Sequence, residues 1–230
     1  MKRPFLFLLL CLTKVFAQAQ TITPEQLIEK VKTKLEQVNN YKALGEMKTN
    51  ISFLKVPNSQ VTVYFKKPNK LKIKNEKGIS LVPKGTVSIS LNTVLKGNYQ
   101  ALDAGTTTLN GIAVRVIKLL PTEENSEVVL STLYIDASRF LVMQAKTTTR
   151  ENGTHELQLT YNKYANYALP DKVVFTFNTS EYKLPKGVTF DYDDGSEKKK
   201  PAGKQDQRGK IEITYSTYEI NKGVSDAVFN

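Results

Sequence analysis

Residues 61–74 read VTVYFKKPNKLKIK and decide the fold. Apolar and polar side chains alternate in both halves of this stretch. Successive side chains of a strand point to opposite faces of a sheet, so a period of two predicts half-buried β-strands. The linker Lys67-Pro68-Asn69 is short, which predicts that the two strands are antiparallel neighbours. The apolar positions are Val61, Val63, Phe65, Leu71 and Ile73.

The same alternation recurs along most of the chain, with short linkers between the apolar runs. Close turns between short strands predict an antiparallel meander, and Asn152-Gly153 has the composition of a hairpin turn. Residues 93–104 are ambiguous and suit a short helix. Residues 191–209 carry almost no apolar side chain, so we expect a mobile loop there. Further strands are expected over residues 47–53, 87–91, 112–120, 127–136, 141–150, 155–164, 173–178 and 211–220.

One helix is expected ahead of the strands. Thr23 can cap it, Pro24 suits its first position, and Gln26 lies three residues after the cap. Apolar side chains then recur at helical spacing among charged ones, which predicts an amphipathic helix that ends near Asn39-Asn40. Its apolar face consists of Leu27, Val31, Leu35 and Val38.

A single helix cannot cover both faces of a sheet of about ten strands. The economical arrangement is a strongly curved antiparallel sheet whose concave face is lined by the alternating apolar residues. The helix and short lid segments would then cover that face. The sequence therefore predicts an α+β fold, an open half-barrel formed as a single domain by residues 20–230.

Residues 1–19, MKRPFLFLLLCLTKVFAQA, have the pattern of a signal peptide. Two cations precede an apolar run, and small residues follow it, which predicts cleavage after Ala19. The run is too short to span a bilayer, so we expect an exported protein. A lipoprotein signal at Cys11 is one alternative, although Leu10 is bulky where such signals have a small residue. A core helix is the other alternative.

The mature chain would be basic and free of cysteine. Its net charge falls from +11 to +8 when Lys2, Arg3 and Lys14 leave with the signal peptide. Loss of Cys11 excludes disulfides, thiolate metal ligands and a cysteine nucleophile. The lysines lack the interleaved aromatics of single-strand binders, so we expect no nucleic-acid partner. They are interpreted as a solvated face that protects sheet edges, with binding to anionic lipid as the alternative.

The sequence lacks a recognisable catalytic or metal-binding motif. His155 is the single histidine, and its place beside a hairpin turn predicts an exposed side chain. The acidic residues within 191–197 lack the spacing of an EF-hand and are interpreted as a solvated loop. We therefore expect no enzyme, no metal and no cofactor. A hydrolase would require His155 to meet a serine and a carboxylate in the fold.

Four stretches resemble the LolA-type outer-membrane lipoprotein carriers and related lipoprotein-sorting proteins. LIEKVKTKLEQVNNYKALGEMKTN (27–50) is similar to the first helix and strand of that family, and VYFKKPNKLKI (63–73) to its basic-basic-Pro-Asn strand pair. YIDASRFLVMQA (134–145) is similar to a strand turn in mid-barrel, and STYEINKGVSDAVF (216–229) to the closing strand and tail. The resemblance implies a half-barrel whose apolar cavity shields the acyl chains of a lipoprotein in the periplasm, in transit toward the outer membrane.

The resemblance also implies partners and a site. The partners would be an acylated lipoprotein or lipid and transfer proteins of the inner and outer membranes, and the carrier would be a monomer that does not span a membrane. The lid face would be Leu27, Val31 and Leu35. The cavity would be lined by Met47, Ile51, Phe53, Val61, Val63, Phe65, Leu71 and Ile73.

Two features depart from that family. Lys67 lies at the expected cavity edge, where the carriers often have an arginine that bonds the lid, and lysine lacks the planar fork of arginine. Residues 180–209 lengthen the region before the last strand. This extension supports an alternative function: a periplasmic sensing or protein-interaction module in envelope regulation, as in RseB-like relatives.

Overall fold

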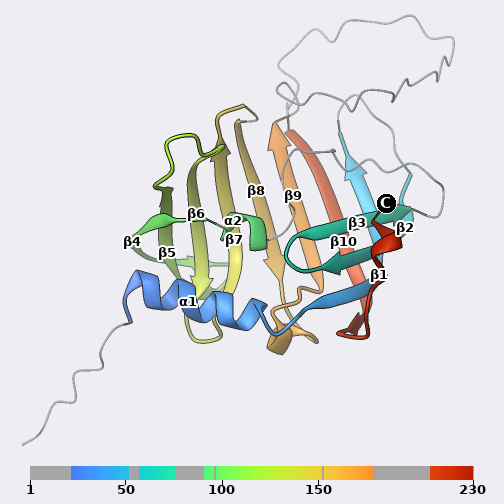
Figure 1. Ribbon diagram of the computed structural model, residues 1–230. Coiled ribbons are helices and arrows are strands. Elements are labelled where there is room, and N and C mark those ends of the chain that lie inside the picture. Colours follow the sequence, from blue (N-terminus) through green and yellow to red (C-terminus); the bar gives the residue numbers. More distant parts are fainter. Residues whose placement is uncertain are drawn as a thin grey trace, which may run out of the picture.

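The computed structural model describes residues 22–51, 57–75, 91–95, 97–151, 153–178 and 208–229. They form one antiparallel sheet of ten strands, strongly curved and not closed on itself, with helix α1 across its concave side (Figure 1). The α+β half-barrel expected from the sequence is confirmed. The elements are α1 (Pro24–Leu35), β1 (Asn40–Asn50), β2 (Ser59–Lys66), β3 (Lys70–Asn75), α2 (Leu91–Val94), β4 (Tyr99–Leu109), β5 (Ile112–Pro121), β6 (Val128–Asp136), β7 (Leu141–Thr149), β8 (Gly153–Thr160), η1 (Ala165–Tyr167), β9 (Lys172–Asn178), β10 (Arg208–Ile220) and η2 (Asp226–Val228).

The first and last strands meet inside the sheet. The strand order is β3-β2-β1-β10-β9-β8-β7-β6-β5-β4, so β10 lies between β1 and β9, and β3 and β4 are the edges. The β1–β10 pair joins the N-terminal strands to the meander. Its register sets Ala43 opposite Tyr218 and Met47 opposite Ile213. Residues far apart in sequence thereby share one concave face.

Helix α1 begins with the predicted capping box. The Thr23 hydroxyl accepts a hydrogen bond from the Gln26 N–H at 3.2 Å, and the Gln26 side chain accepts one from the Thr23 N–H at 2.9 Å. The helix then buries Leu27, Ile28 and Val31 against the sheet. Its amphipathic pattern is therefore satisfied by packing on the concave face.

The helix ends at Leu35, earlier than expected, because Asn221 at the end of β10 binds the following linker. The Asn221 side-chain oxygen accepts hydrogen bonds from the N–H groups of Asn39 and Asn40, and its amide donates to the Gln37 carbonyl at 2.9 Å. These backbone groups are thus committed to a distant side chain instead of a further helical turn.

Strand β4 was not predicted. Most of its side chains are exposed, so no alternation is visible in its sequence. Its pairing with β5 is also irregular between Asp103 and Thr106, where Gly105 has a φ of +87°. The helix expected within 93–104 is wrong for residues 99–104, which belong to β4. Only the short α2 is helical there, and Leu91 begins that helix instead of ending a strand.

Several predictions fall outside the described residues. These include the signal peptide at 1–19, the cavity residue Phe53, residues 87–90 of the strand expected over 87–91, and most of the loop expected at 191–209. Arg208 and Gly209, assigned to that loop from the sequence, belong to strand β10. Within the described residues, no helix has the length and hydropathy needed to cross a membrane.

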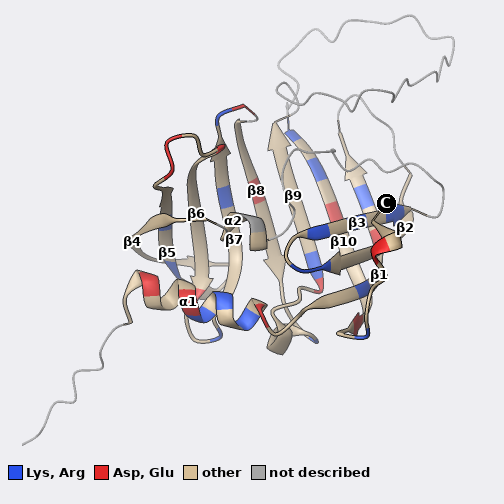
Figure 2. Cartoon of the chain, viewed as in Figure 1, with Lys and Arg blue, Asp and Glu red and all other residues tan. Residues whose placement is uncertain are grey.

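The two faces of the sheet differ in chemistry. The concave face carries the core, in which the largest fully buried side chains include Ile117, Leu133 and Ile213. Charged residues of both signs occur along the strands (Figure 2), and exposed pairs join neighbouring strands, as in Lys42–Glu219 at 3.1 Å and Lys172–Glu212 at 2.8 Å. Such exposed pairs contribute about 0–1 kcal/mol each, so burial on the concave side dominates stability.

Candidate ligand-binding site

A cavity of about 80 Å³ lies on the concave face, between the curved-in strands β1–β3, strands β8–β10 and the C-terminal end of α1. Aliphatic and aromatic side chains form its walls. No charged side chain is among the described residues that line it. The lining residues are Leu35, Val38, Tyr41, Val63, Phe65, Leu71, Ile73, Leu91, Asn92, Leu159, Tyr161, Tyr167, Ala168, Leu169, Pro170, Val173, Tyr215 and Tyr218.

Strand register builds the first wall. Phe65 on β2 lies opposite Tyr41 on β1 and Leu71 on β3, and Val63 lies opposite Ile73. The rings of Tyr41 and Phe65 are stacked with their centroids 5.3 Å apart. Residues that alternate along the sequence thereby become neighbours across three strands.

Tyrosines and the segment between β8 and β9 build the opposite wall. The Tyr161 hydroxyl donates to the Val142 carbonyl at 3.1 Å, and the Tyr218 hydroxyl donates to the Pro170 carbonyl at 2.7 Å. Ala168, at a φ of +51°, ends η1 and turns the chain toward Pro170. The Tyr161 bond fixes the segment 161–170 against β7, and the Tyr218 bond fixes it against β10.

Burial keeps the cavity tyrosines protonated. Loss of contact with water raises the pKa of Tyr41, Tyr161, Tyr215 and Tyr218, because the anionic phenolate is disfavoured away from water. The described part of the site is therefore largely apolar and carries no charge, and its polar side-chain atoms are tyrosine hydroxyls and the Asn92 amide.

The C-terminal end of α1 is held at the edge of this cavity by Lys67. Its ammonium donates to the Glu36 carbonyl at 2.6 Å, and its N–H donates to the Asn39 carbonyl at 2.9 Å. A cation at a helix C-terminus also complements the helix dipole. Lys67 thus contacts the α1–β1 linker, the same segment that Asn221 binds.

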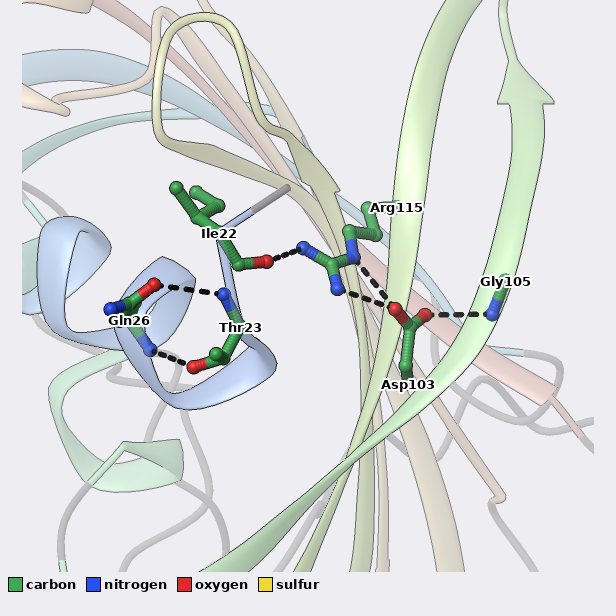
Figure 3. A network of polar contacts seen from close by, with 6 residues as sticks. All are labelled: Ile22, Thr23, Gln26, Asp103, Gly105 and Arg115. Carbon is green, nitrogen blue, oxygen red and sulfur yellow. Dashed lines mark hydrogen bonds and ion pairs between the residues drawn. The ribbon is translucent and has the colours of Figure 1, made fainter. Parts of the chain in front are cut away.

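Arg115 holds the opposite end of α1 (Figure 3). Its guanidinium donates to the Ile22 carbonyl and, at 2.9 Å from Nε, to the Asp103 carboxylate. Asp103 also accepts from the Gly105 N–H at the β4 bulge, which orients the carboxylate. The guanidinium lowers the pKa of Asp103, so the carboxylate is ionised at neutral pH.

The last turn of α1 is also held by its two lysines. Lys34 donates to the Arg139 carbonyl at 2.7 Å, and Lys32 lies over the Tyr99 ring at 4.9 Å. Asp136 shapes the turn that presents this carbonyl, because it accepts hydrogen bonds from Ser138 and Arg139. The helix is therefore fastened along its length by polar contacts as well as by its apolar face.

The structure brings part of the predicted site together. Val63, Phe65, Leu71, Ile73 and Leu35 line the cavity. Met47, Ile51 and Val61 are buried in the core outside its lining, as are Leu27 and Val31 of α1. Lys67 is not among the lining residues and bonds to the Glu36 carbonyl, next to the lining residue Leu35. The ligand-binding role of all these residues remains a prediction.

The sequence reasoning missed the half of the cavity supplied by the C-terminal part of the chain. Its tyrosines come from β10 and from residues 161–170, YNKYANYALP. The strand expected over 155–164 ends at Thr160, so the assignment of residues 161–164 to a strand is wrong. The density of tyrosine in that stretch and in 215–218 was the available signal. Aromatic residues with a polar tip are suited to walls that are only partly dry.

The expectation that His155 is exposed is wrong. Only 6% of its surface is exposed, and its ring lies 5.7 Å from that of Phe175 on the neighbouring strand β9. Removal from water lowers the pKa of His155 to about 4. Its Nδ1 has no hydrogen-bond partner among the described residues. Within that same part of the chain, no group of three acidic, His or Cys side chains is placed to hold a metal ion.

Comparison with known proteins identifies the fold. No family model and no curated protein matches the sequence. One similar structure is a domain from Vibrio parahaemolyticus that is described as an outer membrane lipoprotein-sorting protein domain. The match covers 89% of this chain and 94% of that chain, with a TM-score of 0.56 and 11% sequence identity. A LolA superfamily protein from Nitrosomonas europaea matches 91% and 98%, with a TM-score of 0.56 and 10% identity.

A third similar structure is a DUF1329 family protein from Desulfovibrio piger, with a TM-score of 0.50 and 12% identity over 91% of this chain and 98% of its own. At these identities the likeness shows a shared fold. It confirms, at the level of fold, the resemblance to LolA-type proteins read from the sequence.

Proposed function

We propose that this protein is an exported, non-enzymatic carrier that shields acyl chains of lipoproteins or lipids in the concave cavity during transfer toward the outer membrane. The observation that carries the proposal is the apolar, uncharged cavity at the end of α1. The shared fold supports it, since two of the similar structures bear lipoprotein-sorting or LolA names. The extension on which the sensing alternative rests lies, for residues 180–207, outside the described residues.

The size of the cavity implies that α1 moves when cargo binds. At about 80 Å³ it is smaller than drug-sized ligand pockets, which measure roughly 300–1,000 Å³. Displacing α1 would prolong the cavity along the concave face. The helix would then lose burial of Leu27, Ile28 and Val31, at about 2 kcal/mol each, whereas ten CH₂ groups of a bound chain would contribute about 8 kcal/mol. An acyl chain can therefore offset the opening of the helix.

The ends of α1 suggest how it opens. The C-terminal linker is anchored twice, by Lys67 and by Asn221, while the N-terminal end is held by Arg115. In the carrier model, α1 swings about the anchored linker and Arg115 acts as the latch. Lys67 then belongs to the hinge and not to the latch.

Native mass spectrometry of residues 20–230, purified from envelope extract without detergent, tests the carrier function. We expect adducts with the mass of a fatty acyl lipid, phospholipid or acylated peptide. A protein that is free of adducts and takes up none after incubation with lipid would contradict the proposal and favour the protein-interaction alternative.

A charge at the cavity wall should prevent uptake. Leu71 lines the cavity and is half-buried, so Leu71→Glu can fold with its carboxylate in the apolar space. Burying an unpaired charge is costly, and we expect at least a tenfold loss of lipid adduct. Leu102→Glu is the matched control, because Leu102 is 41% exposed on β4. Equal adduct levels in both variants would place the lipid elsewhere.

Removing the Arg115 latch should speed lipid uptake. Arg115→Met deletes the bond to the Ile22 carbonyl and the pair with Asp103. Hydrogen bonds to charged groups contribute about 1.5–3 kcal/mol, so opening at the N-terminal end should become about 10- to 150-fold more frequent. We expect faster amide exchange in residues 24–27 and faster uptake of a fluorescent fatty acid.

Arg150→Met is the control for that variant, because Arg150 also binds main-chain carbonyls, those of Ser126 and Glu124, but lies away from α1. If amide exchange in residues 24–27 is the same in Arg115→Met as in the wild type, the N-terminal end of α1 is not the part that opens.

A further inference from the structure

Two cavity tyrosines that contact Tyr218 lack a hydrogen-bond partner for their hydroxyl groups among the described residues. Tyr161 and Tyr218 donate to main-chain carbonyls. Tyr41 and Tyr215 line the same cavity, yet their hydroxyls form no hydrogen bond with any described residue. Both rings contact Tyr218, with centroids 5.3 Å and 5.0 Å from it, so the two free hydroxyls belong to one cluster.

Both residues are half-buried and neither hydroxyl is among the fully buried side-chain atoms without a partner, so both groups can bond to water. In the empty protein, a cavity of about 80 Å³ has room for water molecules that bond these groups. A ligand that displaces this water loses affinity unless it supplies an acceptor in its place. A purely hydrocarbon ligand supplies none, so the pair of hydroxyls favours a ligand that carries an oxygen acceptor beside its apolar part.

The lack of cations among the described lining residues limits which acceptor group a ligand can place in the cavity. No cation is among the described lining residues, so a carboxylate or phosphate there would be an unpaired buried charge. The raised pKa values of Tyr41 and Tyr215 keep both hydroxyls neutral, as donors. A neutral carbonyl can accept hydrogen bonds from these hydroxyls without the free-energy cost of burying a charge.

We propose that the hydroxyls of Tyr41 and Tyr215 bind the ester carbonyl of an acylated ligand, so that the cavity selects esterified chains over free fatty acids. This inference rests on the proposed carrier function and names the ligand class of the same site. The apolar wall formed by Phe65 and its neighbours receives the start of the chain, and the tyrosine cluster receives the ester.

The test compares an ester lipid with an ether lipid of the same length. Monopalmitoylglycerol and 1-O-hexadecylglycerol share a glycerol head and an alkyl chain, but only the first has a carbonyl. Their dissociation constants are measured by displacement of a fluorescent lipid from the mature protein, from Tyr41→Phe/Tyr215→Phe, and from the control Tyr64→Phe. Tyr64 is suitable because it lies outside the cavity lining, beneath Lys74.

We expect the wild type and Tyr64→Phe to bind the ester more tightly than the ether, and palmitate more weakly than the ester. In the double variant the ester should lose about 5- to 150-fold in affinity, since each of the two neutral hydrogen bonds contributes about 0.5–1.5 kcal/mol. The ether should change less than about twofold. Circular dichroism verifies the fold of each variant.

The outcomes separate this inference from the carrier function. Equal binding of ester and ether by the wild type, or an ester affinity that survives in the double variant, would overturn the tyrosine site while leaving the carrier intact. Tightest binding of palmitate would also overturn it. If the wild type binds none of the three lipids, the carrier function itself fails.

Discussion

Gly45→Val is expected to lower the free energy of unfolding by about 3 kcal/mol, the upper end of the usual cost of overpacking. A Cβ at Gly45 would lie 2.6 Å from the main-chain oxygen of Thr214 and 3.3 Å from the Tyr215 Cα. Both are backbone atoms of β10, so no side chain can rotate away. The β1–β10 pair, which joins the two parts of the sheet, would have to separate locally.

Strand propensity alone predicts the opposite result, because valine is favoured and glycine depleted in strands over a range of about 1 kcal/mol. The register shift beside Leu44 explains why sterics dominate, since the strands approach closely at this irregularity. Urea unfolding measures the difference. Leu44→Val is the matched control on the exposed face of the same strand and should stay within about 0.5 kcal/mol of wild type. A Gly45→Val protein as stable as that control would contradict the close approach.

The strands that bury one face were predictable from the sequence. In β2, every second residue from Ser59 to Phe65 is buried, which is the period that the sequence displays. β4 lacks this period because it is an edge strand with most side chains exposed. The end of α1 depended on Asn221, whose contacts lie about 180 residues away and leave no local signal. Local sequence patterns therefore predict the strands that bury one face, but not the edge strand or the helix end that a distant side chain determines.

Only one wall of the cavity could be predicted from the sequence, because only that wall consists of strands that bury one face. Its first wall follows from alternation in β2 and β3, where Val63 and Ile73 point inward. Its second wall depends on the segment 161–170, which has no regular period and is positioned by bonds from Tyr161 and Tyr218. Side-chain bonds to distant carbonyls carry no sequence signature. The tyrosine cluster therefore depends on the pairing of β10 with β1, which no local sequence pattern predicts.

His155 shows how a residue next to a turn becomes buried, and its burial predicts acid-sensitive stability. It lies opposite Thr147 on β7, in the row of inward-facing side chains that includes Leu157 and Phe175. Its pKa is about 4 in the folded protein and 6.5 when exposed. A lowered histidine pKa stabilises the fold fully above pH 6.5, and the contribution is lost as pH falls toward 4. The wild type should lose about 2 kcal/mol between pH 7 and pH 5.

His155→Met isolates this contribution, because the chain has only one histidine. Asp103, Asp136 and Glu212 also have lowered pKa values, but carboxylates contribute their pH dependence mainly below about pH 4.5, outside this window. Urea unfolding at pH 7 and pH 5 should therefore show little change in the variant. Absolute stability at pH 7 is not the readout, since loss of the unpaired Nδ1 and altered packing act on it in opposite directions. An equal loss between pH 7 and pH 5 in both proteins would mean that His155 reaches water in the folded state, and the inward-facing row would then be wrong at this position.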